Sequence, residues 1–593
     1  MLSLQEPTVE PARVYYGGEG VPHPGATLSE YTLRQLRHFA ALGDAGPPAQ
    51  VDAATGSSVS FGWLLERCIH AAEGWRALGL RVGDTVAVCS NNHHTLFPVV
   101  LGAMFNGCTV AAVVPSSNAD ELLEALVLVA PHGLVSDEQT APQMAAAAEA
   151  LQRQHAATTH HVVVVDGDGG ASLQLPAAAM SSEGLFQKGA AARGGAEADF
   201  DEYAPADIGD PKQHGSYILF SSGTTGKPKA VITSDYSMLM HSLNPGSWAV
   251  LAGERFLVSS PLSWISGALM MFQCTAVGAT RVFVRGISDE ITLLRTISEF
   301  KISLTFAPPW LLSLVPDALA GAGASYDLSS LRAVATGGAA LGADMQTRLQ
   351  AAMGCTVAQG YGCTEAGVAF SDSTGLPGQP PPKPGSLGRL QPWVQLRLVD
   401  PVSGRDVSED LAEGELRYKT PYLMLRYVGD PKASTQAFDE HGFYCTGDLV
   451  RRDAEGYYYF VDRMKELMKY NSWSISASEL EEVMLCHPNV REAGVVGRPH
   501  AIHGDLPSAF VVRTCEKDLS DEQLREEINQ LLRARLSDHK LLRGGIYFVD
   551  EIPKTTSGKI NRKSLKQRLA SLDNFAKVDH SVREKCVYLE NIH

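Results

Sequence analysis

An alternation of helical and extended apolar segments between residues 58 and 137 restricts the fold more than any other pattern in the chain. The first helical segment carries apolar residues three or four positions apart, namely Leu64, Cys68, Ala72 and Trp75. It is followed by strand, helix, strand and helix patterns at residues 85–89, 94–106, 109–114 and 119–128. Because parallel strands need helical crossovers, the alternation predicts an α/β fold with helices on both faces of a parallel sheet.

The chain has 593 residues, more than a single core supports, so more than one domain is expected. The alternation resumes over residues 256–336, and short alternating strands separated by turns follow over residues 394–459. Residues 462–593 have a separate α+β pattern, with helices over 478–485 and 521–536 and strands near 493–496 and 509–512. We predict a large N-terminal domain of helix-covered sheets with a β-rich subdomain (residues 1–461) and a small α+β lid domain (residues 462–593).

Residues 139–213 interrupt this rhythm with the stretches AAAAEA, GDGG and AARGGAEAD. A core strand over residues 162–165 is compatible with the pattern. We expect most of the segment to be a solvated insertion.

The formal net charge of −16 disfavours nucleic acid as a partner, so an anionic nucleotide would have to be met by local positive groups. No apolar run reaches the roughly 20 residues that a membrane-spanning helix needs. The N-terminus has no signal pattern and the chain does not end in a peroxisomal tripeptide, so we expect a cytoplasmic protein. The sequence does not indicate an oligomeric state.

Residues 217–231 read YILFSSGTTGKPKAV, a short apolar strand pattern followed by a loop of glycines, hydroxyls and lysines. The glycines permit close approach to a ligand, hydroxyl and N–H groups donate to phosphate oxygens, and two lysines supply countercharge. The loop is not a Walker A motif, since only two residues separate Gly223 from Gly226 and a proline follows Lys227. By composition alone, such a stretch is more often a flexible surface loop.

The ordered string resembles the phosphate loop of the adenylate-forming superfamily, which includes acyl-CoA synthetases, 4-coumarate-CoA ligases, beetle luciferases and the adenylation domains of peptide synthetases. The resemblance covers residues 58 to about 566 and includes further motifs in the expected order. In the phosphate loop it implies that ATP is bound by Ser221, Ser222, Gly223, Thr224, Thr225, Gly226 and Lys227.

A second motif, GYGCTE at residues 360–365, follows a predicted strand over 356–359. The resemblance implies that Tyr361 lies against adenine, that Thr364 reaches phosphate, and that Glu365 holds Mg²⁺, a hard cation that prefers carboxylate oxygen. It extends the ATP site to Gln359, Gly360 and Gly362. After an earlier strand, Gly338 is expected beside the adenine and Gly337 beside the acyl group, because small residues allow the backbone to approach a ligand.

A third motif, YCTGD at residues 444–448, resembles the segment whose aspartate accepts from the ribose hydroxyls, which assigns that role to Asp448. Arg463 matches a second ribose contact, and residues 462–465 match an interdomain hinge.

A fourth motif at residues 553–560, PKTTSGKI, resembles a loop that delivers a catalytic lysine, Lys559. A carboxylate that attacks an α-phosphate must approach another anion, and a cation that bridges the two relieves the repulsion in the transition state. Residues 469–474 read KYNSWS where thioester-forming relatives commonly read KYKGFQ. Lys469 is present in both versions, and the resemblance assigns it to the transfer of the acyl group to CoA.

Residues 260–267 match the acyl-pocket segment of the superfamily, with Trp264 and Ser266 as candidate pocket residues. Relatives commonly have histidine where Trp264 stands. The tryptophan either walls the pocket or belongs to the core, and the sequence leaves both open.

The resemblance implies an AMP-forming carboxylate-CoA ligase for a fatty or aromatic acid, with ATP, Mg²⁺ and CoA as its small molecules. The alternatives are a luciferase-like oxygenase that acts on an adenylated acid, an adenylation-only enzyme, and an inactive acyl- or nucleotide-binding protein. Lys559, Glu365 and Asp448 are all present, which disfavours the last.

Overall fold

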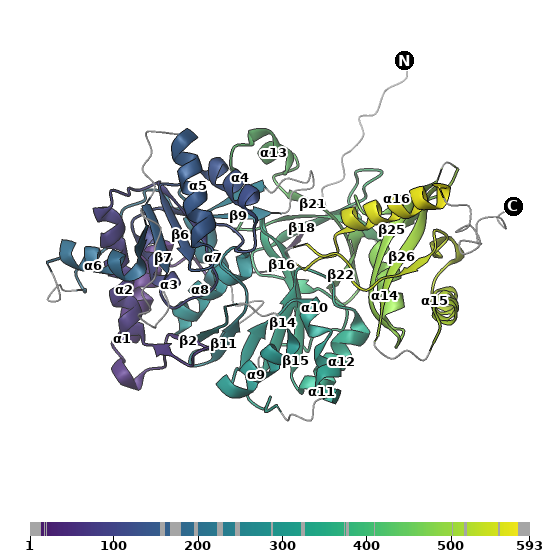
Figure 1. The fold of residues 1–593 in the computed structure, drawn as a ribbon, viewed down its shortest axis with the longest axis horizontal. Coiled ribbons are helices and arrows are strands. Elements are labelled where there is room, and N and C mark those ends of the chain that lie inside the picture. Colours follow the sequence, from purple (N-terminus) through teal and green to yellow (C-terminus); the bar gives the residue numbers. More distant parts are fainter. Residues whose placement is uncertain are drawn as a thin grey trace, which may run out of the picture. The chain divides into compact units, whose positions relative to one another are not determined.

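The computed structural model of the chain separates into two compact units (Figure 1). The first unit comprises residues 1–397, 417–445 and 456–458, and the second comprises residues 398–416, 446–455 and 459–593. The lid predicted from residue 462 falls within the last of these stretches, whereas the two shorter stretches of the second unit were not predicted. The structure describes residues 14–16, 18, 20–154, 161–165, 179–194, 200–221, 229–243, 250–285, 289–321, 326–372, 374, 379–407, 410–471, 473–500, 502–514, 519–555 and 558–578.

Two sheets organise the described part of the first unit. The smaller one has the order β20 (Arg426–Tyr427), β10 (Lys229–Ser234), β9 (Gly215–Ser221), β5 (Thr109–Ala112), β4 (Thr85–Cys89), β6 (Gly133–Asp137), β7 (His161–Val165) and β8 (Ala179–Ser181). Its strands from β9 to β8 are parallel, while β10 is antiparallel to both β9 and β20. The four parallel strands around β4 are almost wholly buried, as expected for a sheet covered on both faces.

The larger sheet has the order β1 (Tyr15–Tyr16), β18 (Gln395–Val399), β19 (Glu413–Lys419), β21 (Tyr444–Arg452), β22 (Tyr457–Arg463), β17 (Gly388–Leu390), β16 (Gly367–Ser371), β15 (Thr356–Cys363), β14 (Ala333–Gly337), β13 (Leu304–Phe306), β11 (Arg255–Val258), β12 (Thr280–Phe283), β2 (Gln50–Asp52) and β3 (Ser58–Val59). Strands β15 to β2 in this order run parallel. Strands β18, β19, β21 and β22 each have residues in both units.

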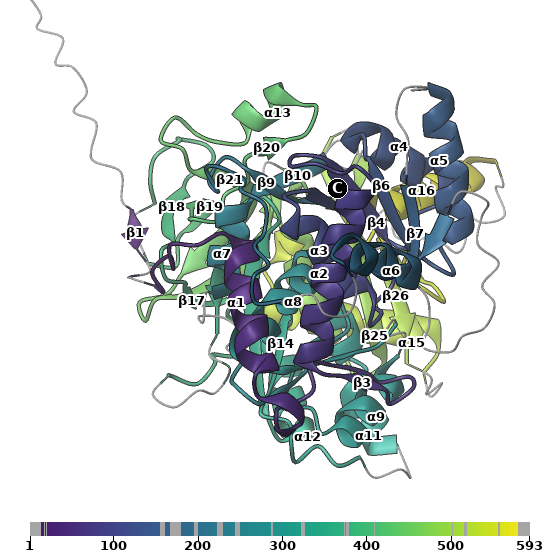
Figure 2. The ribbon, with the colours of Figure 1, turned by 90° about the vertical axis from the view of Figure 1, so that its left-hand side faces the viewer.

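The helices of the first unit are α1 (Leu28–Ala40), α2 (Phe61–Ala77), α3 (Leu96–Phe105), α4 (Ala119–Val129), α5 (Ala141–Gln154), α6 (Ser182–Ala192), α7 (Asp235–Leu243), α8 (Ile265–Val277), α9 (Glu290–Phe300), α10 (Pro309–Leu312), α11 (Val315–Gly321), α12 (Ala343–Met353) and α13 (Pro431–Gln436). Helices α1 and α4 begin with capping boxes, Thr27 with Glu30 and Asn118 with Glu121. Every residue of α3 is buried, and α2 packs against α1, α3 and α6 (Figure 2).

Residues 139–213, predicted to be mostly a solvated insertion, contain two described helices that each bury an apolar face. Helix α5 buries Met144 and Leu151, and α6 buries Leu185 and Phe186. Alanine-rich sequence favours helix, and glycines bring α6 close to α2: a Cβ at Gly189 would collide with the backbone of α2. Gly189 therefore allows α6 to pack closely against α2.

The second unit contains a sheet of its own, with the order β24 (Trp473–Ile475), β23 (Met468–Tyr470), β26 (Gly504–Arg513) and β25 (Val490–His500), and with β27 (Ile546–Phe548) paired to β26. Its helices are α14 (Ala477–Leu485), α15 (Asp521–Arg535) and α16 (Arg562–Val578). The predicted α/β class, with a large sheet-rich domain and a smaller α+β domain, is confirmed.

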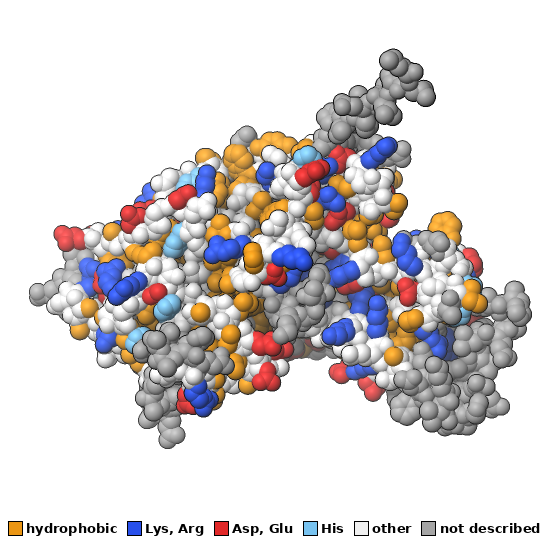
Figure 3. Space-filling model, turned by 90° about the horizontal axis from the view of Figure 1, so that it is seen from above, with side chains coloured by type: hydrophobic (Ala, Val, Ile, Leu, Met, Phe, Trp, Pro, Cys, Tyr) orange, Lys and Arg blue, Asp and Glu red, His pale blue; other side chains and the backbone are white. Residues whose placement is uncertain are grey.

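The helices that the structure describes include none that is both long and apolar enough to cross a membrane. On the face drawn in Figure 3, the described Lys and Arg side chains are interspersed with acidic and hydrophobic ones. The positive groups on this face therefore do not merge into one continuous patch.

Candidate active site

Four parallel strands of the first unit, β11, β13, β14 and β15, lie side by side in the larger sheet and have their carboxyl ends at one edge. Strand β13 pairs with β11 on one side and with β14 on the other, and β14 pairs with β15. The predicted acyl segment follows the end of β11, Gly337 ends β14, and residues 360–363 of the GYGCTE motif end β15. In open parallel sheets, ligands bind at the carboxyl ends of strands. The topology thus brings the predicted acyl and adenine residues to one edge.

Two glycines, Gly337 and Gly338, stand where β14 ends. Gly337 is the register partner of Gly360, and a Cβ at Gly337 would lie 2.9 Å from the Gly360 carbonyl oxygen. Gly338 has a φ of +84°, in the left-handed region that glycine tolerates. The buried Gln359 amide accepts from the Leu341 N–H and donates to the Leu341 carbonyl, both at 2.9 Å. Gln359 therefore holds the loop after β14 against β15.

Strand β15 continues to Cys363, so Gly360, Tyr361 and Gly362 are part of the strand and do not follow it as predicted. A Cβ at Gly362 would lie 2.7 Å from the Gly367 carbonyl oxygen of β16, which explains why no side chain fits there. Tyr361 is half-buried, and its ring centroid lies 5.9 Å from that of Phe370.

The phosphate loop joins two antiparallel strands. Ser221 ends β9 and pairs with Lys229, the first residue of β10. Ser222, Gly223, Thr224, Thr225, Gly226 and Lys227 lie outside the described residues. A strand-to-strand connection differs from the strand-to-helix connection of a Walker A loop. The Tyr217 hydroxyl of β9 donates to the Leu262 carbonyl at 3.0 Å, which ties this hairpin to the acyl segment.

Tyr427 of β20, which sequence reasoning missed, contacts two motifs at once. Its hydroxyl donates to Glu365 Oε1 at 3.1 Å, and the Lys229 ammonium lies 4.6 Å from its ring centroid. Burial, reinforced by the negative charge of Glu365, raises the pKa of Tyr427, so the hydroxyl remains a donor. Periodicity gives no signal for it, since a two-residue strand has no readable periodicity.

In the acyl segment, Trp264 is half-buried immediately before α8. Ser266 is buried, and its hydroxyl donates to Ser260 Oγ at 2.9 Å. A Cβ at Gly267 would collide with the Pro261 carbonyl, so the segment folds tightly onto the start of the helix. Whether Trp264 faces a substrate stays a prediction.

In the second unit, Arg463 Nε lies 3.4 Å from Asp448 Oδ1, so the two predicted ribose residues are neighbours. Asp462 is buried, and its carboxylate accepts from the backbone N–H groups of Arg463 and Ala477, each at 2.7 Å. Asp462 therefore anchors the predicted hinge segment to the first turn of α14.

Lys559 lies in a tight turn of the second unit. Its N–H donates to Thr555 Oγ1 at 3.2 Å, its carbonyl accepts from the Thr555 N–H at 2.7 Å, and Gly558 takes a φ of +75°. Thr556 and Ser557 lie outside the described residues. Lys469 is exposed on β23, where its N–H donates to Asp505 Oδ2 at 3.0 Å.

A chain of charged side chains leads from the ribose residues to the base of the Lys559 turn. Arg463 lies 3.6 Å from Glu466, and Glu466 lies 3.5 Å from Arg562, three residues after Lys559. Arg562 also donates to both carboxylate oxygens of Glu481 at 2.9 Å. The sequence analysis matched residues 462–465 to a hinge and did not predict this network.

The described side chains suit a metal ion that binds together with a nucleotide. Among the described residues, no three His, Cys, Asp or Glu side chains gather as a metal site. Mg²⁺ is usually held by one or two carboxylates together with phosphate oxygens and water, and the buried Glu365 is a carboxylate that could serve as one of them.

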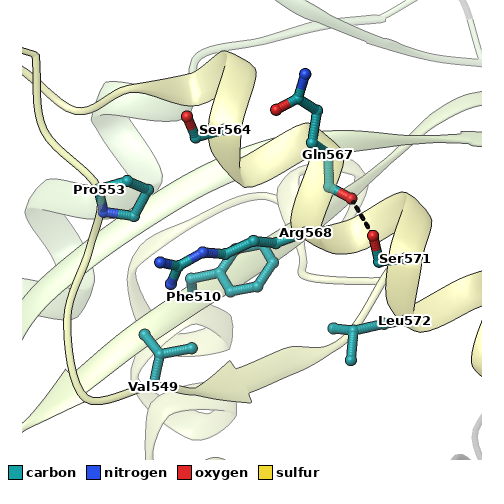
Figure 4. A pocket seen from close by; sticks show the side chains of 8 residues that line it. All are labelled: Phe510, Val549, Pro553, Ser564, Gln567, Arg568, Ser571 and Leu572. Atoms are coloured by element: carbon teal, nitrogen blue, oxygen red, sulfur yellow. Dashed lines mark hydrogen bonds between the residues drawn. The ribbon is translucent and has the colours of Figure 1, made fainter.

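The second unit also has an open hollow of about 580 Å³ between α16 and the strands beneath it (Figure 4). Phe510 and Val549 form its floor, and the Arg568 side chain extends along it. Pro553, at the start of the lysine loop, lines one side. None of the predicted site residues lines this hollow.

Family models match most of the chain: the AMP-binding enzyme model over residues 39–428, and the AMP-binding enzyme C-terminal domain model over residues 479–559. The chain belongs to the AMP-binding enzyme family. The resemblance to the adenylate-forming superfamily is thereby confirmed.

Among the relatives of this AMP-binding enzyme is a luciferin 4-monooxygenase of Luciola mingrelica, 29% identical over 533 residues, which are 88% of this chain and 92% of the relative. The 4-coumarate-CoA ligase 2 of Oryza sativa subsp. japonica is 28% identical over 553 residues, 92% of each chain. Among solved structures, the anthranilate CoA ligase AuaEII in complex with anthranoyl-AMP matches with a TM-score of 0.77 at 22% identity, covering 92% of this chain and 97% of the other. The names of these relatives include a monooxygenase and CoA ligases, so membership of the family leaves the acceptor open.

Proposed function

We propose that the protein is an AMP-forming carboxylate-CoA ligase: it condenses an organic acid with ATP to an acyl-adenylate and pyrophosphate, and then transfers the acyl group to CoA. The observation that carries the first step is the convergence of Lys229 and Glu365 on Tyr427, which joins a phosphate-loop cation to a metal-binding carboxylate. A triphosphate with its dication needs both kinds of group.

Each residue then has a stated task in adenylation. The phosphate loop and Lys229 hold the triphosphate, and Glu365 holds Mg²⁺, which neutralises the phosphate charge when bound. Gly337 and Gly338 admit the acyl group and adenine, while Asp448 and Arg463 bind the ribose. Lys559 stabilises the charge that develops as the carboxylate oxygen attacks the α-phosphorus and pyrophosphate leaves.

The thioester step is the finer part of the proposal. The CoA thiol attacks the acyl carbon and AMP leaves, with Lys469 placing positive charge beside the adenylate. The similarity to a 4-coumarate-CoA ligase supports CoA as the acceptor and an aromatic acid as the first to test. The similarity to a luciferin 4-monooxygenase supports oxygen as the competing acceptor.

The test separates the two steps. Acid-dependent exchange of labelled pyrophosphate into ATP is first screened across aromatic, fatty and small acids. Lys559→Ala should lower this exchange by about 10²-fold or more while ATP affinity changes little, because the lysine acts on the transition state. CoA is then added with the best acid, and acyl-adenylate and acyl-CoA are followed by mass spectrometry. Near-normal exchange in Lys559→Ala would refute the role of Lys559. Adenylate that accumulates without any acyl-CoA would refute the thioester step.

A further inference from the structure

We propose that Tyr427 is a positioning residue that orients Glu365 and Lys229 together for a magnesium-bound triphosphate. The inference rests on the proposed function, which supplies ATP and Mg²⁺ as the ligand. It adds a residue that lies outside the four motifs described above. It assigns the Tyr427 hydroxyl to the metal-binding carboxylate and the Tyr427 ring to the lysine.

The hydroxyl orients the carboxylate. Glu365 is buried, and Oε1 accepts the Tyr427 hydroxyl at 3.1 Å. The Glu365 carbonyl accepts from the Met424 N–H at 2.7 Å, so one short segment holds both the backbone and the side chain of Glu365. Partners of this kind fix the direction of a metal ligand, and their loss typically costs 10- to 100-fold in metal affinity or activity.

The ring seats the cation. Lys229 Nζ lies 4.6 Å from the ring centroid, within the range of a cation–π contact. The backbone keeps this geometry, since Tyr427 is the register partner of Val231, two residues after Lys229 on β10. Tyr427 thus links Lys229, which follows the phosphate loop, to Glu365.

Two substitutions separate these roles. Tyr427→Phe removes only the hydroxyl, whereas Tyr427→Leu removes the hydroxyl and the ring. Tyr418→Phe is the matched control: Tyr418 is as buried as Tyr427, and its hydroxyl donates to the Gly367 carbonyl at 2.8 Å and lies 3.0 Å from Cys363 Sγ, without contact to Glu365.

The measurement is ATP affinity by titration calorimetry, once with excess Mg²⁺ and once with EDTA, on the full chain. Wild type should bind ATP more tightly with Mg²⁺. Tyr427→Phe should lose about 10- to 100-fold of the affinity for MgATP and keep its affinity for metal-free ATP. Tyr418→Phe should retain both affinities. Tyr427→Leu should in addition weaken metal-free ATP by about 2- to 5-fold, as expected for a lost cation–π contact.

The outcomes distinguish this inference from the function on which it rests. If wild type binds ATP with a Mg²⁺ effect that Tyr427→Phe leaves intact, or that Tyr418→Phe reduces equally, the positioning role is refuted and the proposed function stands. If wild type does not bind ATP, or binds it without regard to Mg²⁺, the proposed site fails and this inference fails with it. Should Tyr427→Leu not fold, Tyr427→Phe and its control decide alone.

Discussion

Replacing Arg562 with glutamine should destabilise the second unit strongly, because it leaves a buried carboxylate without its cation. The Arg562 and Glu481 side chains are only 16% and 11% exposed, and the guanidinium meets both carboxylate oxygens at 2.9 Å. Removing one partner of a buried ion pair costs about 3–5 kcal/mol, since the other charge stays desolvated. At an m value of about 2 kcal/mol per M, this shifts the urea midpoint by about 2 M.

The chain offers a matched control in Lys540→Gln, which removes the cation of another ion pair in the same unit. Lys540 lies 2.6 Å from Glu479, but these side chains are 25% and 36% exposed. A solvent-exposed pair contributes about 0–1 kcal/mol. Burial, the largest cause, raises the pKa of Glu481 to about 7 although Arg562 opposes the shift. Because the folded-state pKa is raised, protonation relieves the unpaired carboxylate, and the loss in Arg562→Gln should be smaller at pH 6 than at pH 8.

The assay is urea unfolding of wild type, Arg562→Gln and Lys540→Gln at both pH values, with pyrophosphate exchange measured on the folded variants. Arg562 begins α16 three residues after Lys559, so losing it should disturb the position of Lys559. Pyrophosphate exchange by Arg562→Gln should therefore be slower than by wild type even at urea concentrations where the variant is still folded. Equal midpoint shifts in the two variants would refute the reasoning, as would a loss that does not depend on pH.

Three further predictions concern other parts of the molecule. Trp264→Ala should shift the acid preference toward bulkier or longer acids, by about 0.8 kcal/mol for each methylene that becomes buried; an unchanged acid profile in a folded, active variant returns Trp264 to the core. Asp235 is buried and accepts a hydrogen bond from the Leu28 N–H at 2.8 Å, and burial raises its pKa to about 6. Its contribution to the free energy of unfolding therefore falls as the pH rises from about 4 to 6. Asp235→Asn, which keeps an acceptor, should therefore gain up to about 3 kcal/mol relative to wild type between pH 4 and pH 8 in denaturant titrations, and a constant difference contradicts this. Lys469→Ala should slow acyl-CoA formation and spare pyrophosphate exchange; parallel losses in both would remove it from the second step.

Local sequence was sufficient wherever one element buries a periodic apolar face. The helix predicted from Leu64, Cys68, Ala72 and Trp75 is α2, and the strand predicted at residues 85–89 is β4. These patterns indicate which side chains of an element are buried, and a pattern of this kind can be read from a few adjacent residues. The segment with α5 and α6 escaped prediction because its small residues look like linker sequence, and their value appears only when a partner helix packs against them.

The sequence by itself therefore determined the α/β class, the family and the motifs that can hold a nucleotide, since each depends on residues adjacent in the chain. Tertiary structure alone decided how those motifs are held. Tyr427 lies 62 residues from Glu365, and Arg562 lies 81 residues from Glu481. Neither pair leaves a local pattern, because a hydrogen bond or an ion pair depends on the distance between atoms in space, and strand pairing and helix packing set that distance only after the chain has folded.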